Sequence, residues 1–282
     1  MAERSEIVFV DGVRTPFGRA GEKGMYWNTR ADDLIVKAMI ALLERNPSIP
    51  KDRFDDVAIA ATTQQGDQGL TLGRTAALLA GLPRSVPGYA LDRMCAGAMT
   101  TVTTIAGAIA FGAYDIGIAG GVEHMGRHPM GFGADPNPRF LAEKLVSADA
   151  LNMGNTAERI HDRFPLLTKE RADRFAMASQ HKATAAYKAG KIQPDLIPVA
   201  IKTTEGWGLA TRDEGLRPET TLEGLAGLKT PFRPHGRVTA GNASSLNDGG
   251  AAVVVTSEAF AKAHGLNILA RITGYATGAG NP

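Results

Sequence analysis

The sequence predicts an α/β protein, in which a mostly parallel sheet is layered between helices and a loop domain is inserted. Two patterns indicate this class. Short apolar runs alternate with segments whose apolar residues recur every three or four positions, which is typical of strands that alternate with amphipathic helices. From residue 122 to about residue 238 frequent prolines interrupt the alternation, which then resumes. A connection of this length inside a compact fold is typically functional.

The elements before the insertion are short and follow one another closely. Residues 7–10 form an apolar run that ends at Asp11-Gly12, which predicts a buried strand running into a turn. The following elements are an amphipathic helix over 31–43, a strand over 57–61, a helix over 73–79 that ends at Gly81-Leu82-Pro83, and an extended approach over 87–91.

An uncharged run from Leu91 to Gly112 predicts the central helix. No charged residue lies between Arg93 and Asp115, so the helix has no charged face and should be covered on all sides. Cys95, the only cysteine, falls in its first turn, where unpaired N–H groups and the helix dipole stabilise a thiolate. Two simpler interpretations stay open: a buried packing cysteine and a membrane span. Several threonines, and the absence of flanking basic clusters and aromatic belts, disfavour the span.

Further strands of the sheet are predicted after this helix, on both sides of the insertion. Residues 114–119 predict a strand closed by Gly120-Gly121, which brings its end to the sheet edge near Cys95, where open α/β sheets bind ligands. The later elements are helices over 156–164 and 169–189, the second capped by Thr168 and stopped by Gly190, then a strand over 251–256, a helix over 258–264 and a strand over 269–275.

The composition indicates a globular protein that acts in a reducing compartment. The 282 residues can bury a sizeable core, and 44% hydrophobic and 21% charged residues are ordinary values. The net charge of +2, without a run of Lys or Arg, gives no support for nucleic-acid or membrane-surface partners. A single cysteine excludes an internal disulfide, and no secretion signal opens the chain, so the cytoplasm is expected. The six histidines show no metal-ligand spacing, which predicts no metal site.

Seven motifs occur in the order and near the spacing that one enzyme family shows. Asp92-Arg93-Met94-Cys95-Ala96-Gly97-Ala98-Met99 resembles the nucleophile motif of the thiolases, which cleave 3-ketoacyl-CoA or condense two acyl-CoA molecules. The others lie at residues 13–18, 80–83, 120–125, 153–158, 213–221 and 238–249. The variants Glu123-His124-Met125 and Arg217-Pro218-Glu219-Thr220-Thr221 look most like the degradative 3-ketoacyl-CoA thiolases (acetyl-CoA C-acyltransferases) of fatty-acid β-oxidation.

The resemblance implies a role for three residues. Cys95 would attack the ketone carbonyl, release the acetyl-CoA enolate and carry the acyl group as a thioester until CoA removes it, with its backbone N–H as half of an oxyanion hole. Ser244 matches the family serine at the pantetheine arm, and Arg217 the arginine near the nucleotide end of CoA. Without the resemblance, Ser244 is a turn or cap residue and Arg217 a solvated surface charge. CoA and acyl-CoA are substrates, and no cofactor is implied.

Three positions depart from the family pattern. Asp92 stands where asparagine is usual and places a negative charge near Cys95, which disfavours a thiolate. Gly97-Ala98 stands where a serine followed by a small residue is common. Asn152 replaces the histidine of many biosynthetic relatives, which argues against a biosynthetic role.

The resemblance also implies a division of the chain. Residues 1–121 and 241–267 correspond to an N-terminal core, residues 122–240 to the inserted loop domain, and residues 268–282 to the first strand of a C-terminal half. In the family that half completes a five-layer fold and supplies an activating histidine, a second cysteine as acid/base and an Asn-Glu loop. None of these is found in the sequence. We therefore expect the chain alone to be inactive, because the leaving carbon needs a positioned acid.

Alternatives from other classes stay open at this point. A non-catalytic thiolase-like protein that binds acyl-CoA or a partner subunit would explain Asp92 and the missing acid/base residues. An unrelated cysteine hydrolase would need a histidine partner, and no histidine lies in a recognisable partner motif. The family resemblance further implies a homodimer or tetramer, and for some degradative members a hydratase/dehydrogenase subunit. Acyl chain length and a steroid or fatty-acyl preference are not readable from these motifs.

Overall fold

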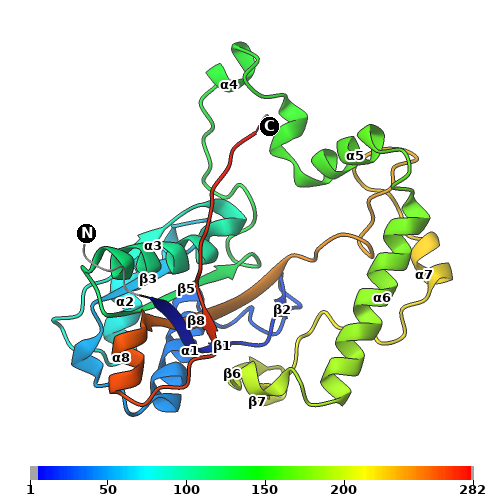
Figure 1. Ribbon diagram of the computed structural model, residues 1–282. Coiled ribbons are helices and arrows are strands. Elements are labelled where there is room, and N and C mark those ends of the chain that lie inside the picture. Colours follow the sequence, from blue (N-terminus) through cyan, green and yellow to red (C-terminus); the bar gives the residue numbers. More distant parts are fainter. Residues whose placement is uncertain (1–5, 281–282) are drawn as a thin grey trace. The chain divides into compact units, whose positions relative to one another are not determined.

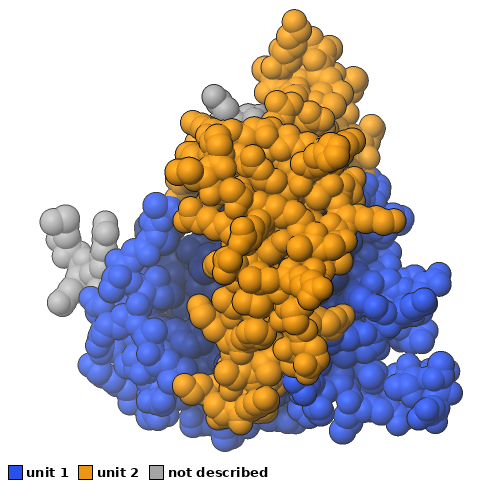
Figure 2. All heavy atoms as spheres, turned by 90° about the vertical axis from the view of Figure 1, so that its right-hand side faces the viewer, with its two compact units in different colours: residues 1–133, 195–214, 246–276 blue, residues 134–194, 215–245, 277–282 orange. Residues whose placement is uncertain are grey.

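The computed structural model describes residues 6–280, so most of the opening segment examined for a secretion signal lies outside the described residues. The chain forms two compact units (Figure 2). Unit 1 comprises Met1–Gly133, Asp195–Glu214 and Leu246–Ala276, and unit 2 comprises Ala134–Pro194, Gly215–Ser245 and Thr277–Pro282. Residues 195–214, in the middle of the expected insertion, therefore cluster with the core.

A seven-stranded sheet forms the centre of unit 1 (Figure 1). Its strand order is β4-β3-β5-β8-β1-β9, and β2 pairs with β8. The strands are β1 (Ile7–Arg14), β2 (Gly18–Arg19), β3 (Asp56–Ala60), β4 (Tyr89–Leu91), β5 (Ile116–His124), β8 (Asn247–Ser257) and β9 (Ala270–Arg271).

The expectation of a mostly parallel sheet is wrong. Only β4, β3 and β5 run parallel, while β8 pairs antiparallel with β5, β1 and β2. Parallel neighbours need a crossover connection, and helices supply such crossovers only from β3 to β4 and from β4 to β5. The strand β8 follows a long segment that includes most of unit 2. A connection of this length can place β8 in either direction relative to β5.

Helices cover the two faces of this sheet. The helices of unit 1 are α1 (Ala31–Arg45), α2 (Leu72–Leu79), α3 (Gly97–Phe111) and α8 (Glu258–Ala263), with short 3-10 turns η1 (Lys51–Arg53), η2 (Gly66–Gln68) and η3 (Met94–Ala96). Alternate residues of β3 face opposite cores: Val57 and Ile59 pack in the cluster with α1 and α2, and Ala58 packs in the cluster with α3. The predicted alternation of strands and helices is confirmed.

The predicted turn at Asp11-Gly12 is wrong, because β1 continues through it to Arg14. A register shift between Phe9 and Asp11 marks a bulge in its pairing with β8. The Asp11 carboxylate accepts hydrogen bonds from Arg45 and Asn46 at the end of α1, at 2.7–3.0 Å. These partners satisfy a charged side chain inside a strand, and residue types alone do not reveal them.

The central helix is shorter and less covered than the uncharged run suggested. It begins with η3 and continues as α3, whose side facing the sheet is buried. On its other side Met99 is 67% and Phe111 is 88% exposed among the described residues. Met94–Phe111 is also the one described helix long and apolar enough to cross a membrane, a test that the core helix of a soluble protein passes as well.

Unit 2 contains the helices of the insertion. They are α4 (Arg139–Ala142), η4 (Ala148–Leu151), α5 (Met153–Arg163), α6 (Lys169–Lys188) and α7 (Leu222–Ala226). The predicted cap Thr168 is confirmed, since its side chain accepts a hydrogen bond from the N–H of Arg171. Gly190 adopts φ +69° and ends α6 as predicted. The helix α5 begins earlier than predicted because the side chain of Asn152 caps it.

The excursion of unit 1 at residues 195–214 is a β-hairpin. It follows the turn η5 (Gln193–Asp195) and consists of β6 (Val199–Thr203) and β7 (Gly206–Ala210), paired antiparallel. The predicted final strand over 269–275 is limited to β9, which pairs with β1 of the same sheet.

Acid should loosen β9 before the rest of unit 1. Hydrogen bonds from Arg271 of β9 and from Lys262 lower the pKa of Glu258 to about 2. Because the folded-state pKa is depressed, the stabilisation is complete above the unfolded pKa of about 4.3 and is lost as the pH falls towards 2. We expect the protection of the Leu269 and Ile272 amides, measured relative to their intrinsic exchange rates, to fall between pH 5 and pH 2, because their N–H groups bond to β1. In Glu258→Gln this extra acid sensitivity should be absent. The same pH dependence in Glu258→Gln as in the unmodified chain would contradict the role of the carboxylate.

Candidate active site

Cys95 lies at the sheet edge where several strands end. The parallel strands β4, β3 and β5 present their carboxyl ends there, at Leu91, Ala60 and His124. The antiparallel strand β8 begins at the same edge, because Asp248 pairs with His124. The sequence predicts that strand ends converge near Cys95, and the register of the strands explains how they do so.

A strained turn presents the cysteine. Met94 has φ +47°, a left-handed conformation that is uncommon for a residue with a side chain. The carboxylate of Asp92 accepts a hydrogen bond from the N–H of Met94 at 2.7 Å and so stabilises the turn. Cys95 follows directly and is exposed, without a hydrogen-bond partner among the described residues. The interpretation as a buried packing cysteine is therefore wrong, and strand, turn and helix together display a thiol at a helix start.

Small residues hold the start of α3 close to the sheet. A Cβ on Gly97 would lie 2.8 Å from the Cβ of Ala60, and one on Gly121 would lie 3.0 Å from that of Ala98. The hydroxyl of Thr101 accepts the N–H of Gly120 at 3.1 Å and donates to the carbonyl of Ala98 at 2.7 Å. This close contact restrains the position of Cys95 without any charged group.

A buried polar network supports the loops beside Cys95. Glu123, at the end of β5, accepts hydrogen bonds from the N–H of Thr62 at 2.9 Å and from the Gln68 amide at 2.7 Å. The amide oxygen of Gln68 accepts the N–H of His124 at 2.7 Å. Glu123 thus ties the loop after β3 to the end of β5, which gives the Glu-His-Met motif a structural role.

Asp67 and His128 form a buried pair that the sequence analysis missed. The Nε2–H of His128 donates to Asp67 at 2.5 Å, and the second Asp67 oxygen accepts from the N–H of Ala31 and contacts Arg127, both at 3.2 Å. Burial raises the pKa of Asp67, but the bonds from His128 and Ala31 and the charge of Arg127 hold it below its usual value. The pair fixes the segment after β5 to the start of α1.

A second histidine is buried beside an aspartate. Nδ1 of His124 accepts the N–H of Arg127 at 3.1 Å, so its Nε2–H donates to the carbonyl of Tyr26 at 2.9 Å in the neutral ring. Asp248 lies 3.4 Å from that Nδ1. Burial raises the pKa of the Asp248 carboxyl. His124 therefore has a structural function. Its neighbours Tyr26 and Asp248 lie far from it in the sequence, so no local motif could have indicated these contacts.

The two predicted CoA-binding residues belong to unit 2. Arg217 is exposed, and its N–H donates to the side chain of Gln180 on α6 at 2.7 Å. Ser244 is also exposed, in the loop that precedes β8. The two ends of their segment meet, since a Cβ on Gly215 would lie 3.9 Å from Oγ of Ser245. Cys95 belongs to unit 1.

Metal ligation has no candidate in the described part of the chain. No group of three or more His, Cys, Asp or Glu side chains among residues 6–280 is placed to hold an ion.

Comparison with known proteins assigns this architecture to a family. Residues 7–259 match the model of the thiolase N-terminal domain. The chain is 39% identical to the beta-ketoadipyl-CoA thiolase of Pseudomonas putida, over 97% of this chain and 71% of that protein. It is also 39% identical to the 3-ketoacyl-CoA thiolase of Aliivibrio fischeri, over 98% of this chain and 71% of that protein. The crystal structure of human mitochondrial 3-ketoacyl-CoA thiolase superposes with a TM-score of 0.84 at 30% identity, over 96% of this chain and 70% of that one. The chain belongs to the thiolase family.

Proposed function

We propose that the chain carries the nucleophile of a degradative thiolase, which cleaves a 3-ketoacyl-CoA with CoA to give acyl-CoA and acetyl-CoA. The observation that carries the proposal is the exposed Cys95 on its strained turn at the start of α3. A thiolase sequence and fold surround this turn over nearly the whole chain.

The reaction proceeds in two acyl transfers. The Cys95 thiolate attacks the C3 carbonyl of the substrate, and the tetrahedral oxyanion is stabilised by N–H groups at the helix start. The bond between C2 and C3 then breaks, so that the acetyl-CoA enolate leaves and takes a proton while the acyl group stays on Cys95 as a thioester. The thiolate of free CoA attacks this thioester and releases acyl-CoA and the Cys95 thiolate.

The enolate needs a proton donor that the described residues do not place beside Cys95. Its sulfur has no hydrogen-bond partner among residues 6–280, and both nearby buried histidines are held by other groups. We propose that the acid/base groups come from a C-terminal half, which would pack on the exposed side of α3. On this view Cys95 of the chain alone can accept an acyl group from acyl-CoA by thioester exchange, which expels the CoA thiolate, but it does not cleave a 3-ketoacyl-CoA.

Arg217 and Ser244 complete the proposal as CoA-binding residues, on the nucleotide and pantetheine ends respectively. Their exposure on unit 2 leaves both side chains accessible to a ligand. A reactive free thiol suits a reducing compartment such as the cytoplasm. We further propose a homo-oligomeric assembly, on the family resemblance.

The relatives favour two substrate classes. The 3-ketoacyl-CoA thiolase of Aliivibrio fischeri supports an aliphatic 3-ketoacyl-CoA, as in β-oxidation. The beta-ketoadipyl-CoA thiolase of Pseudomonas putida, at the same 39% identity, supports a substrate with a terminal carboxylate. We propose the β-oxidation substrate first, because the Glu123-His124-Met125 and Arg217–Thr221 variants are most like those of the degradative 3-ketoacyl-CoA enzymes.

Incubation of the purified 29.7 kDa chain with acetoacetyl-CoA, a longer 3-ketoacyl-CoA and beta-ketoadipyl-CoA tests these proposals. We expect acyl-CoA to block rapid iodoacetamide labelling of Cys95 and to leave one acyl group on the cysteine, and we expect no CoA-dependent cleavage of the three 3-ketoacyl-CoA substrates. Steady turnover by the pure chain would refute the need for outside acid/base groups. A Cys95 that iodoacetamide does not label would instead support a non-catalytic binding protein.

A further inference from the structure

The segment Arg14–Ala20, here called the crossing clamp, holds three places where the chain passes between its two units. The first is the passage into the hairpin at residue 195. The carbonyl of Arg14 accepts the N–H of Ile197 at 3.0 Å, and Arg14 forms a parallel bridge with Leu196. The strand β1 thus receives the chain as it returns from unit 2.

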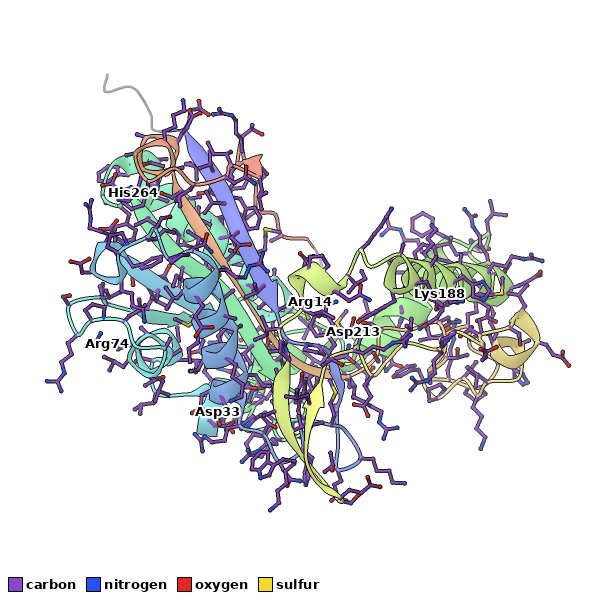
Figure 3. The ribbon with its side chains drawn as sticks, turned by 90° about the horizontal axis from the view of Figure 1, so that it is seen from below. Arg14, Asp33, Arg74, Lys188, Asp213 and His264 are labelled. Atoms are coloured by element: carbon purple, nitrogen blue, oxygen red, sulfur yellow. The ribbon has the colours of Figure 1, made fainter. Side chains whose placement is uncertain are left out.

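The second passage, after Glu214, is held by side chains (Figure 3). The Arg14 guanidinium donates two hydrogen bonds to Asp213, at 2.7 and 2.9 Å, and about four fifths of each side chain is buried. Asp213 also accepts the N–H of Phe17 at 2.7 Å. Glu214 donates its N–H to the carbonyl of Phe17 at 2.8 Å and accepts the N–H of Arg19 at 2.7 Å. Two adjacent carboxylates are therefore committed to the clamp.

The third passage lies before Leu246, where the chain returns to form β8. The N–H of Ala20 donates to the carbonyl of Leu246 at 3.0 Å, and β2 pairs with residues 247 and 248. A Cβ on Gly249 would lie 2.6 Å from the Phe17 ring, so β8 and the clamp are in direct contact. The sequence motifs at residues 13–18, 213–221 and 238–249 therefore meet in one structure.

We propose that Arg14, Asp213 and Glu214 are positioning residues for CoA: they fix both ends of the segment 215–245 and thereby set its affinity for CoA. Arg217 follows Glu214 by three residues, and Ser244 precedes Leu246 by two. Ligand binding costs less when the contacting segments are ordered in advance, so a fixed segment binds more tightly. The inference rests on the proposed roles of Arg217 and Ser244.

The test compares two bidentate Arg–Asp pairs that start from the same strand. Asp213→Asn removes the charge at the crossing, and Asp11→Asn removes it from the pair with Arg45, which lies outside the clamp. We expect Asp213→Asn to raise the Kd of CoA, measured by calorimetry, about tenfold, and Asp11→Asn to change it by less than about twofold. The iodoacetamide labelling rate of Cys95 without CoA should stay within about twofold in both variants. Arg14→Lys, which keeps the charge but loses the fork, should give an intermediate Kd.

Hydrogen exchange supplies a readout that needs no ligand. Asp213→Asn should speed exchange in residues 215–221 and 241–246, and Asp11→Asn should leave both segments unchanged. Unchanged exchange and unchanged Kd in Asp213→Asn would overturn the inference, as would equal effects of the two variants. If the unmodified chain fails to bind CoA, the proposed CoA site fails, and the exchange comparison still decides whether the clamp orders these segments.

Discussion

Replacing Cys95 by serine is expected to abolish transfer of an acyl group to the chain, by at least about a thousandfold. A serine hydroxyl stays protonated at neutral pH, and no described residue is placed to remove its proton. The measurement is the mass of the intact protein after incubation with acetyl-CoA, with release of CoA followed in parallel. The unmodified chain should gain one acetyl group, and Cys95→Ser should gain none.

Binding measurements separate loss of the nucleophile from loss of structure. Serine differs from cysteine by one atom at an exposed position, so Cys95→Ser should keep its melting temperature and its affinity for CoA. Acylation of Cys95→Ser at the normal rate would show that another group reacts and would refute the assignment of the nucleophile.

Gly73→Ala is expected to cause a large loss of stability, more than about 4 kcal/mol. A Cβ at this position would lie 2.1 Å from the carbonyl oxygen of Tyr89 and 2.5 Å from that of Val57. Both atoms belong to the backbone, so no side chain can move aside and α2 would have to separate from β3 and β4. Because β4 leads directly into the turn with Cys95, the damage should reach the site.

Gly107→Ala provides the matched control, since Gly107 is also a helix glycine, in α3. The nearest atom to a Cβ there is Oη of Tyr275, at 3.7 Å, so the methyl group fits. Alanine favours the helix over glycine, and we expect a gain of roughly 0.5–1 kcal/mol. Urea denaturation gives both values. A Gly73→Ala protein as stable as the unmodified chain would contradict the close packing of α2 on the sheet.

Local patterns in the sequence predicted the elements of unit 1 well. The apolar periodicity of α1 and the uncharged run of α3 are properties of consecutive residues, and both helices form. The cap of α6 at Thr168 and its end at Gly190 were also predicted, because capping is chemistry between residues three or four apart. Asn152 was read only as a departure from the family, whereas its cap extends α5.

The direction of the strands and the supports of the site required the folded structure. Pairing of β8 with β5 and β1 joins segments more than a hundred residues apart, and an apolar run carries no sign of the direction in which it will pair. The ion pairs of Asp67 with His128 and of Arg14 with Asp213 likewise join side chains that are distant in the sequence, 61 and 199 residues apart. In the sequence alone, each of these residues would be expected to lie on the surface as a solvated charge.

The sequence by itself determined the family, the candidate nucleophile Cys95 and the succession of helices and strands, because these depend on short motifs and on periodicity along the chain. Only the tertiary structure decided that Cys95 is exposed on a strained turn, that the sheet is mixed, and that residues 14–20 anchor three passages between the units. The physical reason is that burial, strand direction and ion pairing depend on which distant segments meet, and the order of neighbouring residues does not encode this in any local pattern.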